Sequence, residues 1–236
     1  MDVGPRIILR FDNGFYITET AIWAVIVAVA VVAFCLACTR NLKRDPKGLQ
    51  AVAELIIEYV YSFVRDSMGK RNMGFAPYIG TLFIYLLVCN AIGLLGFRAP
   101  TADLNFTVAM GILVFFLIQI NSMRAKGVGG YFKHFAQPYP FMIPINVLEE
   151  FTFPISLSFR IFGNILAGVI VMELLFELLG FVSMELLHLP IPLFQAVIPL
   201  PLNAFFDIFE PALQAFVFCM LTMSFIEKAN VLHHED

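Results

Sequence analysis

The chain has 236 residues, of which 60% are hydrophobic and only 14% are charged, and its mean hydropathy is +0.84. Soluble domains usually carry about 25% charged residues, so this composition excludes a disordered chain, a nucleic-acid binder and an ordinary cytosolic enzyme. The net charge of −3 does not indicate a binding partner, but the positions of the charged residues along the chain are informative. We therefore predict an all-α integral membrane protein that forms a single membrane domain over residues 1–236.

The first two predicted helices differ in character. Residues 20–39 are uncharged, and twenty residues suffice to cross a hydrocarbon core of about 30 Å at about 1.5 Å per residue. Residues 48–68 carry apolar positions at helical spacing, with Glu54, Glu58 and Arg65 on the opposite side. That pattern indicates an amphipathic helix lying at the membrane surface rather than crossing it.

The rest of the chain predicts two hairpins. Uncharged runs predict a transmembrane hairpin over residues 75–97 and 104–123. Residues 141–188 and 202–229 predict two longer helices, the second kinked one turn before Pro211. The first of these helices would exceed the membrane thickness of about 30 Å. Because a proline-rich turn joins the two, we expect a strongly tilted hairpin within the membrane.

The basic residues are distributed asymmetrically across the predicted spans. Eleven Lys and Arg residues lie on one side, in residues 40–71 and 124–133 and at Lys228, whereas the other side holds three. By the positive-inside rule, the N-terminus lies outside and the C-terminus lies in the cytoplasm. The fifteenth basic residue, Arg160, belongs to neither side.

Arg160 is the only Lys or Arg between Lys133 and Lys228. A guanidinium stays charged, and at the centre of a membrane helix it costs about 2.5–3.5 kcal/mol on insertion scales. Such a residue marks an ion path or a buried counter-ion, and the alternative is a side chain that reaches an interface. Ser156 and Asn164 share the face of Arg160 because they lie four residues from it on either side.

The last predicted helix carries a polar stripe. Asn203, Asp207, Glu210 and Gln214 are spaced by 4, 3 and 4 residues, which puts all of them on one face of an otherwise apolar helix. We interpret this stripe as part of a hydrated ion path, and the alternative is a structural hydrogen-bonded seam. Glu173, on the preceding helix, adds an acid with no nearby basic partner in the sequence.

Several segments are similar to one known family. Residues 156–168, around Arg160, resemble the signature that surrounds the essential arginine of the a subunit of bacterial F-type ATP synthases. Residues 213–222 resemble the motif of that family's last helix. Residues 100–105, 126–130 and 146–150 resemble further landmarks in the same order.

The resemblance implies a non-catalytic stator subunit of the rotary ATP synthase in the bacterial inner membrane. Its implied partners are the ring of c subunits, the b-type peripheral stalk subunits, other ATP synthase subunits and membrane lipid, with no nucleic acid, cofactor or metal. Two offset half-channels would let H⁺ or Na⁺ reach a ring carboxylate from one side and leave to the other. Arg160 would face that carboxylate and couple ion flow to rotation and ATP synthesis.

The resemblance also implies roles for individual residues of this chain. The resemblance places the outer half-channel along Asn164, Asp207 and Gln214, with Asp103 near its mouth. To this path we add Asn203, Glu210 and Glu173 from the polar pattern. The inner half-channel is expected along Ser156 and Glu149 or Glu150.

One position departs from the family. Val169 stands where members of the family often have glutamate or histidine. Glu173 lies four residues later on the same helical face, about 6 Å along the axis, and could supply the missing acid. The alternative is that Glu173 lies among lipid headgroups together with Glu177.

Two other functional classes are alternatives for a membrane protein of this kind. A secondary transporter could use Arg160 to bind an anionic substrate, but no internal repeat is visible in the sequence. An intramembrane enzyme would need a metal-ligand cluster or a nucleophile–base pair, and we find neither. The four histidines fall in expected loops or the tail: His134, His188, His233 and His234.

Overall fold

A computed structural model describes residues 7–10, 16–40, 48–95, 97, 99–135, 139–186 and 193–231. The basic segment 41–47, Arg98 and the prolines at 190 and 192 lie outside these ranges, as do the ends of the chain. The predicted orientation of the termini and the predicted turn after residue 186 therefore remain expectations.

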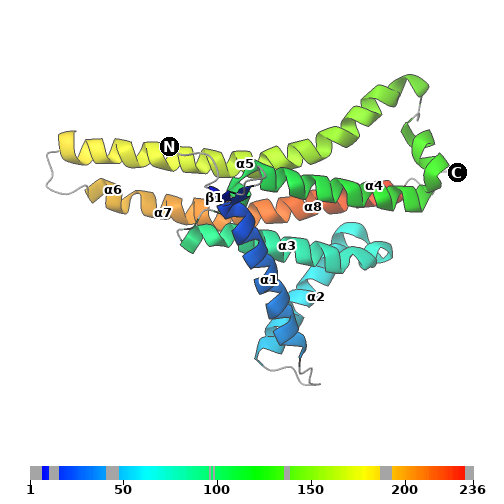
Figure 1. The fold of residues 1–236 in the computed structure, drawn as a ribbon, viewed down its shortest axis with the longest axis horizontal. Helices are drawn as coiled ribbons and strands as arrows, with labels where there is room; N and C mark the ends of the chain where they lie inside the picture. The colour runs from blue at the N-terminus through cyan, green and yellow to red at the C-terminus, as the bar shows by residue number, and fades with distance from the viewer. Residues whose placement is uncertain are drawn as a thin grey trace.

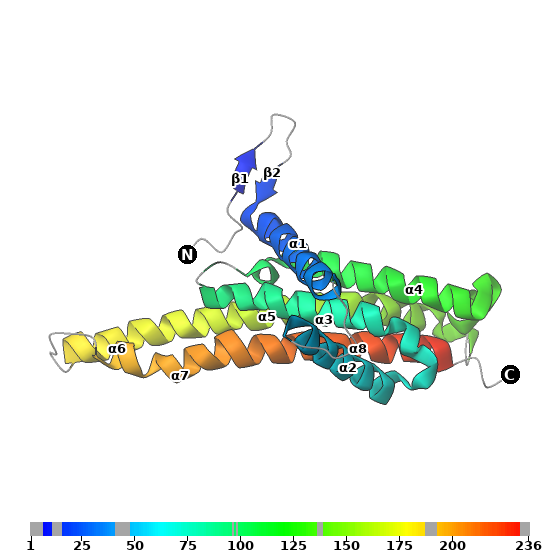
Figure 2. The same ribbon diagram turned by 90° about the horizontal axis from the view of Figure 1, so that it is seen from below.

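The described chain is built almost entirely of helices. Their bounds are α1 Glu19–Thr39, α2 Leu49–Met68, α3 Ala76–Ala91, α4 Leu104–Phe135, α5 Ile143–Phe181, α6 Leu193–Val197, α7 Pro199–Ala204 and α8 Glu210–Val231. Helix α5 lies alongside α6, α7 and α8, which run back in the opposite direction (Figures 1 and 2). Helices α3 and α4 pack on this long hairpin, and α1 crosses the others at a steep angle (Figure 1).

Four stretches among the described residues are long and apolar enough to cross a membrane: Glu19–Thr39, Lys70–Ala91, Leu104–Gly127 and Pro140–Glu185. The prediction of an all-α integral membrane protein is confirmed. The surface position of α2 and the tilt of the long hairpin stay predictions. One small element was not expected from the sequence: the short strands β1 (Ile7–Arg10) and β2 (Tyr16–Thr18) form an antiparallel pair before α1.

Two irregularities in the helices have identifiable causes. In α4, Gly127 adopts φ 69° and ψ 162°, which interrupts the helix and which glycine tolerates better than other residues. A π-helix, Phe205–Phe209, separates α7 from α8 and ends two residues before Pro211. Proline lacks an N–H and its ring clashes with the carbonyl group four residues earlier, so a wider turn lies where the sequence predicted a kink.

The main apolar core lies where α2, α3, α4, α5 and α8 meet. Its fully buried side chains include Val64, Ile79, Val114, Leu157 and Phe218. Helices α4 and α5 approach each other closely at Gly111, where a Cβ atom would lie 2.8 Å from the carbonyl oxygen of Pro154. This packing holds the middle of α5, which carries Arg160, against the rest of the bundle.

Candidate functional site

Arg160 lies on α5 with its side chain exposed. Within the described part of the chain, no hydrogen bond or ion pair joins it to another residue. Its exposed neighbours on α5 include the apolar Ile155 and Phe159, and the polar Ser156 and Asn164 one turn away on either side. A permanent positive charge is therefore available here to a group from another molecule.

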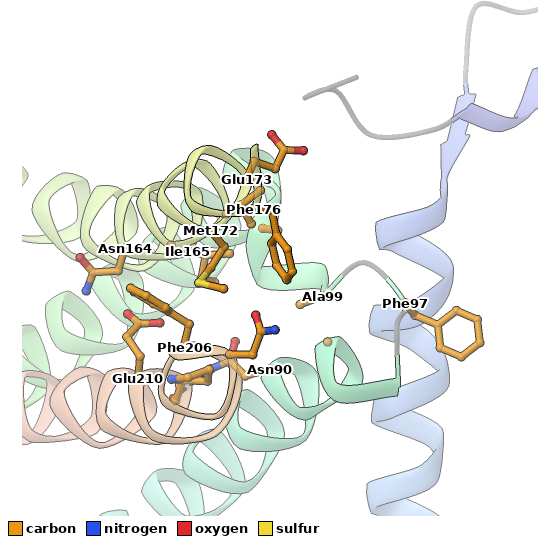
Figure 3. Close-up of a pocket in the computed structure, with 16 residues that line it drawn as sticks. Asn90, Phe97, Ala99, Asn164, Ile165, Met172, Glu173, Phe176, Phe206 and Glu210 are labelled. Carbon is orange, nitrogen blue, oxygen red and sulfur yellow. Dashed lines mark hydrogen bonds between the residues drawn. The ribbon is translucent and has the colours of Figure 1, made fainter. Parts of the chain in front are cut away.

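A cavity of about 370 Å³ opens beside the next turn of α5 (Figure 3). We call it the Asn164 cavity. Four residues predicted from the sequence line it: Asn164 and Glu173 from α5, Asn203 from α7 and Glu210 from α8. The structure thus brings two polar residues of α5 and two members of the predicted polar stripe to the walls of one cavity.

An amide pair and two buried polar atoms lie at or next to this cavity, although Gln214 is not among its lining residues. Asn164 Nδ2 donates a hydrogen bond to Gln214 Oε1 over 3.0 Å, joining α5 to α8. Glu210 Oε1 and Gln214 Nε2 are buried without a hydrogen-bond partner among the described residues. Because buried polar groups are nearly always satisfied, these atoms are suited to bind water or a group supplied by a partner.

Asn90 belongs to a wall of the same cavity and is hydrogen-bonded to Thr101 behind it, and both residues were missed from the sequence. Asn90, on α3, lines the cavity and donates from Nδ2 to the carbonyl oxygen of Pro211 over 3.2 Å. The hydroxyl of Thr101 donates to Asn90 Oδ1. The available signal was an amide side chain in the otherwise apolar run 75–97.

Asp103 lies at the start of α4 and is only 6% exposed. Its carboxylate accepts hydrogen bonds from the Thr20 hydroxyl at 2.8 Å and from the Asn105 N–H at 3.0 Å, so it caps α4 and ties this helix to α1. It is not among the residues lining the Asn164 cavity, although its neighbour Ala102 is.

The remaining acids predicted on this side occupy different places. Glu173 is exposed, and its carboxylate points away from Glu210 and the cavity interior (Figure 3). Val169 lines the same cavity. Asp207 falls within the π-helix before Pro211, but its side chain lies outside the described part of the structure.

A second cavity, of about 230 Å³, includes Arg160 itself, and we call it the Arg160 cavity. Two residues predicted for the inner path, Glu149 and Ser156, line it together with apolar side chains of α5 and α8. Glu149 Oε1 forms an ion pair with Lys228 Nζ of α8 at 2.6 Å. Carboxylate, hydroxyl and guanidinium groups therefore share this space.

Glu150 points elsewhere, although it follows Glu149 directly. It is not among the residues lining the Arg160 cavity, and its Oε2 accepts a hydrogen bond from Gln119 Nε2 at 2.7 Å. The Oε1 of Gln119 accepts in turn from the hydroxyl of Tyr131 at 2.8 Å. Burial, and secondarily the negative charge of Glu150, raise the pKa of Tyr131.

The two cavities reach α5 at adjacent turns. Arg160 lines one and Asn164, four residues later, lines the other, a separation of about 6 Å along the helix axis. Both open between α5 and α8. An ion-exchanging group placed beside Arg160 could therefore reach polar side chains on either side of the guanidinium.

Comparison with known proteins identifies the family. Residues 21–227 match the family described as ATP synthase A chain. The chain belongs to this family. It is 35% identical to ATP synthase subunit a of Moorella thermoacetica over 219 residues, which cover 92% of this chain and 91% of the relative. It is 38% identical to the chloroplastic ATP synthase subunit a of Stigeoclonium helveticum over 216 residues, covering 86% and 81%.

Membership of the ATP synthase A chain family confirms the resemblance stated from the sequence. The chain is a multi-pass membrane protein and an ion-translocating subunit of the membrane sector, and it is not itself catalytic. It acts as part of the stator, in company with other ATP synthase subunits. This identity leaves no place for a solute transporter that uses Arg160 to bind an anionic substrate.

Proposed function

We propose that this chain supplies two ion half-channels and one essential arginine to a rotary ATP synthase. The observation that carries the proposal is the pair of cavities that meet α5 at Arg160 and one turn later at Asn164. One path leads from outside into the Asn164 cavity, and the other leads from the Arg160 cavity to the cytoplasm. Arg160 stands between them and faces a carboxylate of the c-subunit ring.

In the outer path, the ion passes polar groups on both walls of the Asn164 cavity. The proposed lining residues are Asn164, Glu173, Asn203, Asp207, Glu210 and Gln214. Asp103 supports the mouth by holding the start of α4 against α1. In the inner path, Ser156 and Glu149 line the cavity, and Glu150 lies directly beside Glu149.

The coupling step follows from electrostatics. The guanidinium of Arg160 favours the ionised form of a ring carboxylate, so an ion is released there and another binds after the ring moves on. A fixed positive charge also blocks a cation from passing directly between the two paths. Each elementary charge that crosses 100 mV supplies about 2.3 kcal/mol, which rotation of the ring converts to torque. The ion is H⁺ or Na⁺, according to the ligands of the ring.

The exposed apolar surface beside Arg160 fits such a partner. Phe159, Val171 and Leu174 of α5 and Leu213 of α8 are exposed. In the assembled enzyme this surface contacts the c ring, and other apolar faces contact lipid and the b-type stalk subunits. The N-terminus lies outside and the C-terminus in the cytoplasm, in the inner membrane of a bacterial cell.

Replacement of Arg160 tests the proposal. Arg160→Ala, assayed as the whole ATP synthase in vesicles, is expected to assemble but to lose ion-driven ATP synthesis completely. Arg160→Lys should fail as well, because a compact ammonium lacks the planar and permanently charged fork. Arg65→Ala, at an exposed arginine of α2, is the matched control and should keep wild-type synthesis. Wild-type synthesis by Arg160→Ala would refute the proposal.

A further inference from the structure

Three polar side chains from separate segments meet near the start of α5. Gln119 of α4 is only 6% exposed, and its amide contacts both Glu150 of α5 and Tyr131, which follows the break in α4. Neither Gln119 nor Tyr131 lines the Asn164 or the Arg160 cavity. We call Tyr131, Gln119 and Glu150 the clasp.

The clasp depends on the interruption of α4 at Gly127. In a continuous helix, the 12 residues between Gln119 and Tyr131 would separate them by about 18 Å along the axis. The positive φ of Gly127 instead lets the last part of α4 turn toward the start of α5 (Figure 1). A second contact ties the same two segments, because Asn146 Nδ2 donates to the carbonyl oxygen of Phe135 over 2.9 Å.

The chemistry of the three groups allows only one order of donors and acceptors in the hydrogen bonds of the clasp. A carboxylate only accepts hydrogen bonds, so Gln119 must turn its NH₂ group toward Glu150. The amide oxygen then points to Tyr131, whose hydroxyl donates to it. The opposite amide orientation would place an oxygen against the carboxylate. Tyr131 thus fixes the amide of Gln119, and the amide fixes the carboxylate of Glu150.

The consequence is a division of roles between two adjacent acids. Successive residues of a helix point about 100° apart. Glu149 faces the Arg160 cavity and pairs with Lys228, whereas Glu150 faces α4. We propose that Gln119 and Tyr131 are positioning residues that hold the Glu150 carboxylate at one place beside the inner path. This inference rests on the proposed function, because it assigns a supporting device to that path.

A double-mutant cycle in the whole ATP synthase tests the inference. Gln119→Leu should lower ATP synthesis and ATP-driven ion pumping about tenfold, the effect of one hydrogen bond to a charged group. Tyr131→Phe, which removes one oxygen atom, should lower both two- to tenfold. Tyr139→Phe is the matched control at an exposed tyrosine and should change neither.

The decisive comparison uses Glu150→Gln as the background. If Gln119 acts only by positioning the carboxylate, Gln119→Leu/Glu150→Gln will be no slower than Glu150→Gln alone. If Gln119 has a purely structural role, the losses of rate caused by Gln119→Leu and Glu150→Gln will be independent and will multiply in the double variant, and this result would overturn the inference. Wild-type rates in both Gln119→Leu and Tyr131→Phe would also overturn it. If Gln119→Leu fails to assemble, the cycle of Tyr131→Phe with Glu150→Gln decides in the same way.

A parallel Arg160→Ala sample separates this inference from the proposed function. If Arg160→Ala loses ATP synthesis while Gln119→Leu and Glu150→Gln act independently, only the inference about the clasp is overturned and the proposed function stands. Wild-type synthesis in Arg160→Ala overturns the half-channel proposal itself, whatever the cycle shows.

Discussion

The two cavities beside Arg160 differ in their walls and in their charges. The Asn164 cavity is enclosed by residues from α3, α5, α7, the π-helix at Phe205–Phe209 and α8, together with the turn at 99–102. The described residues that line the Arg160 cavity all come from α5 and α8. The first cavity contains Glu210, whose Oε1 has no hydrogen-bond partner among the described residues, whereas the carboxylate of Glu149 in the second is paired with Lys228.

This difference leads us to expect distinct tasks for the two proposed paths. Glu210 is half-buried and forms no ion pair among the described residues, so no neighbouring cation holds its carboxylate in the ionised form. In the proposed outer path we therefore expect it to take up and release a proton. In the Arg160 cavity, the exposed carboxylate of Glu149 is paired with Lys228, so these two charges largely offset each other. We therefore expect substitutions in the Asn164 cavity to affect ion flow far more than substitutions of the Glu149–Lys228 pair.

Glu210→Gln is expected to have the largest effect of these. The amide keeps the shape of the side chain but cannot exchange a proton, so passive proton conduction through the membrane sector should fall on the order of a hundredfold. Glu177→Gln, at an exposed acid of α5 that does not line the cavity, is the matched control and should conduct normally. Normal conduction by Glu210→Gln would remove the proposed contrast between the cavities.

Glu173→Gln is expected to have a smaller effect. Because the carboxylate of Glu173 points away from the cavity interior, we expect conduction to fall only about threefold, roughly 0.65 kcal/mol at about 1.4 kcal/mol per factor of ten. Val169→Glu should partly restore it, since Val169 lines the same cavity one turn nearer to Arg160. Both variants are measured as proton conduction in vesicles. If Glu173→Gln conducts at the wild-type rate, the outer path runs past Glu210 without Glu173.

Helical periodicity predicts which residues of one helix share a face. It put Asn164 on the face of Arg160 and Gln214 on the polar stripe of the last helix, and the resemblance placed both along the outer half-channel. The structure joins the two side chains by a hydrogen bond. Asn90 could not be placed in this way. Its contact with Pro211, 121 residues later in the chain, depends on how α3 packs against α8. Local spacing shows which face of a helix is polar, but not which distant helix covers it.

The separation of Glu149 from Glu150 was beyond sequence reasoning for the same reason. Both acids were expected on the inner path as alternatives. What distinguishes them is the partner each meets, Lys228 of α8 for one and Gln119 of α4 for the other. Helix α4 reaches Phe135, beyond the predicted end at residue 123, and the break at Gly127 within it brings Tyr131 to Gln119.

Lys228→Ala is expected to have the smallest effect. The side chains of Lys228 and Glu149 are 58% and 56% exposed, and ion pairs in such surroundings contribute about 0–1 kcal/mol. Proton conduction should therefore change by less than about fivefold. The difference from wild type should shrink further as salt is raised from 0.01 M to 1 M, because the Debye length falls from about 30 Å to about 3 Å. The expectation fails if Lys228→Ala loses as much proton conduction as Glu210→Gln, or if its loss persists at high salt. Either result would show that Lys228 acts on the ion path itself and that the two cavities differ less in charge than their contacts indicate.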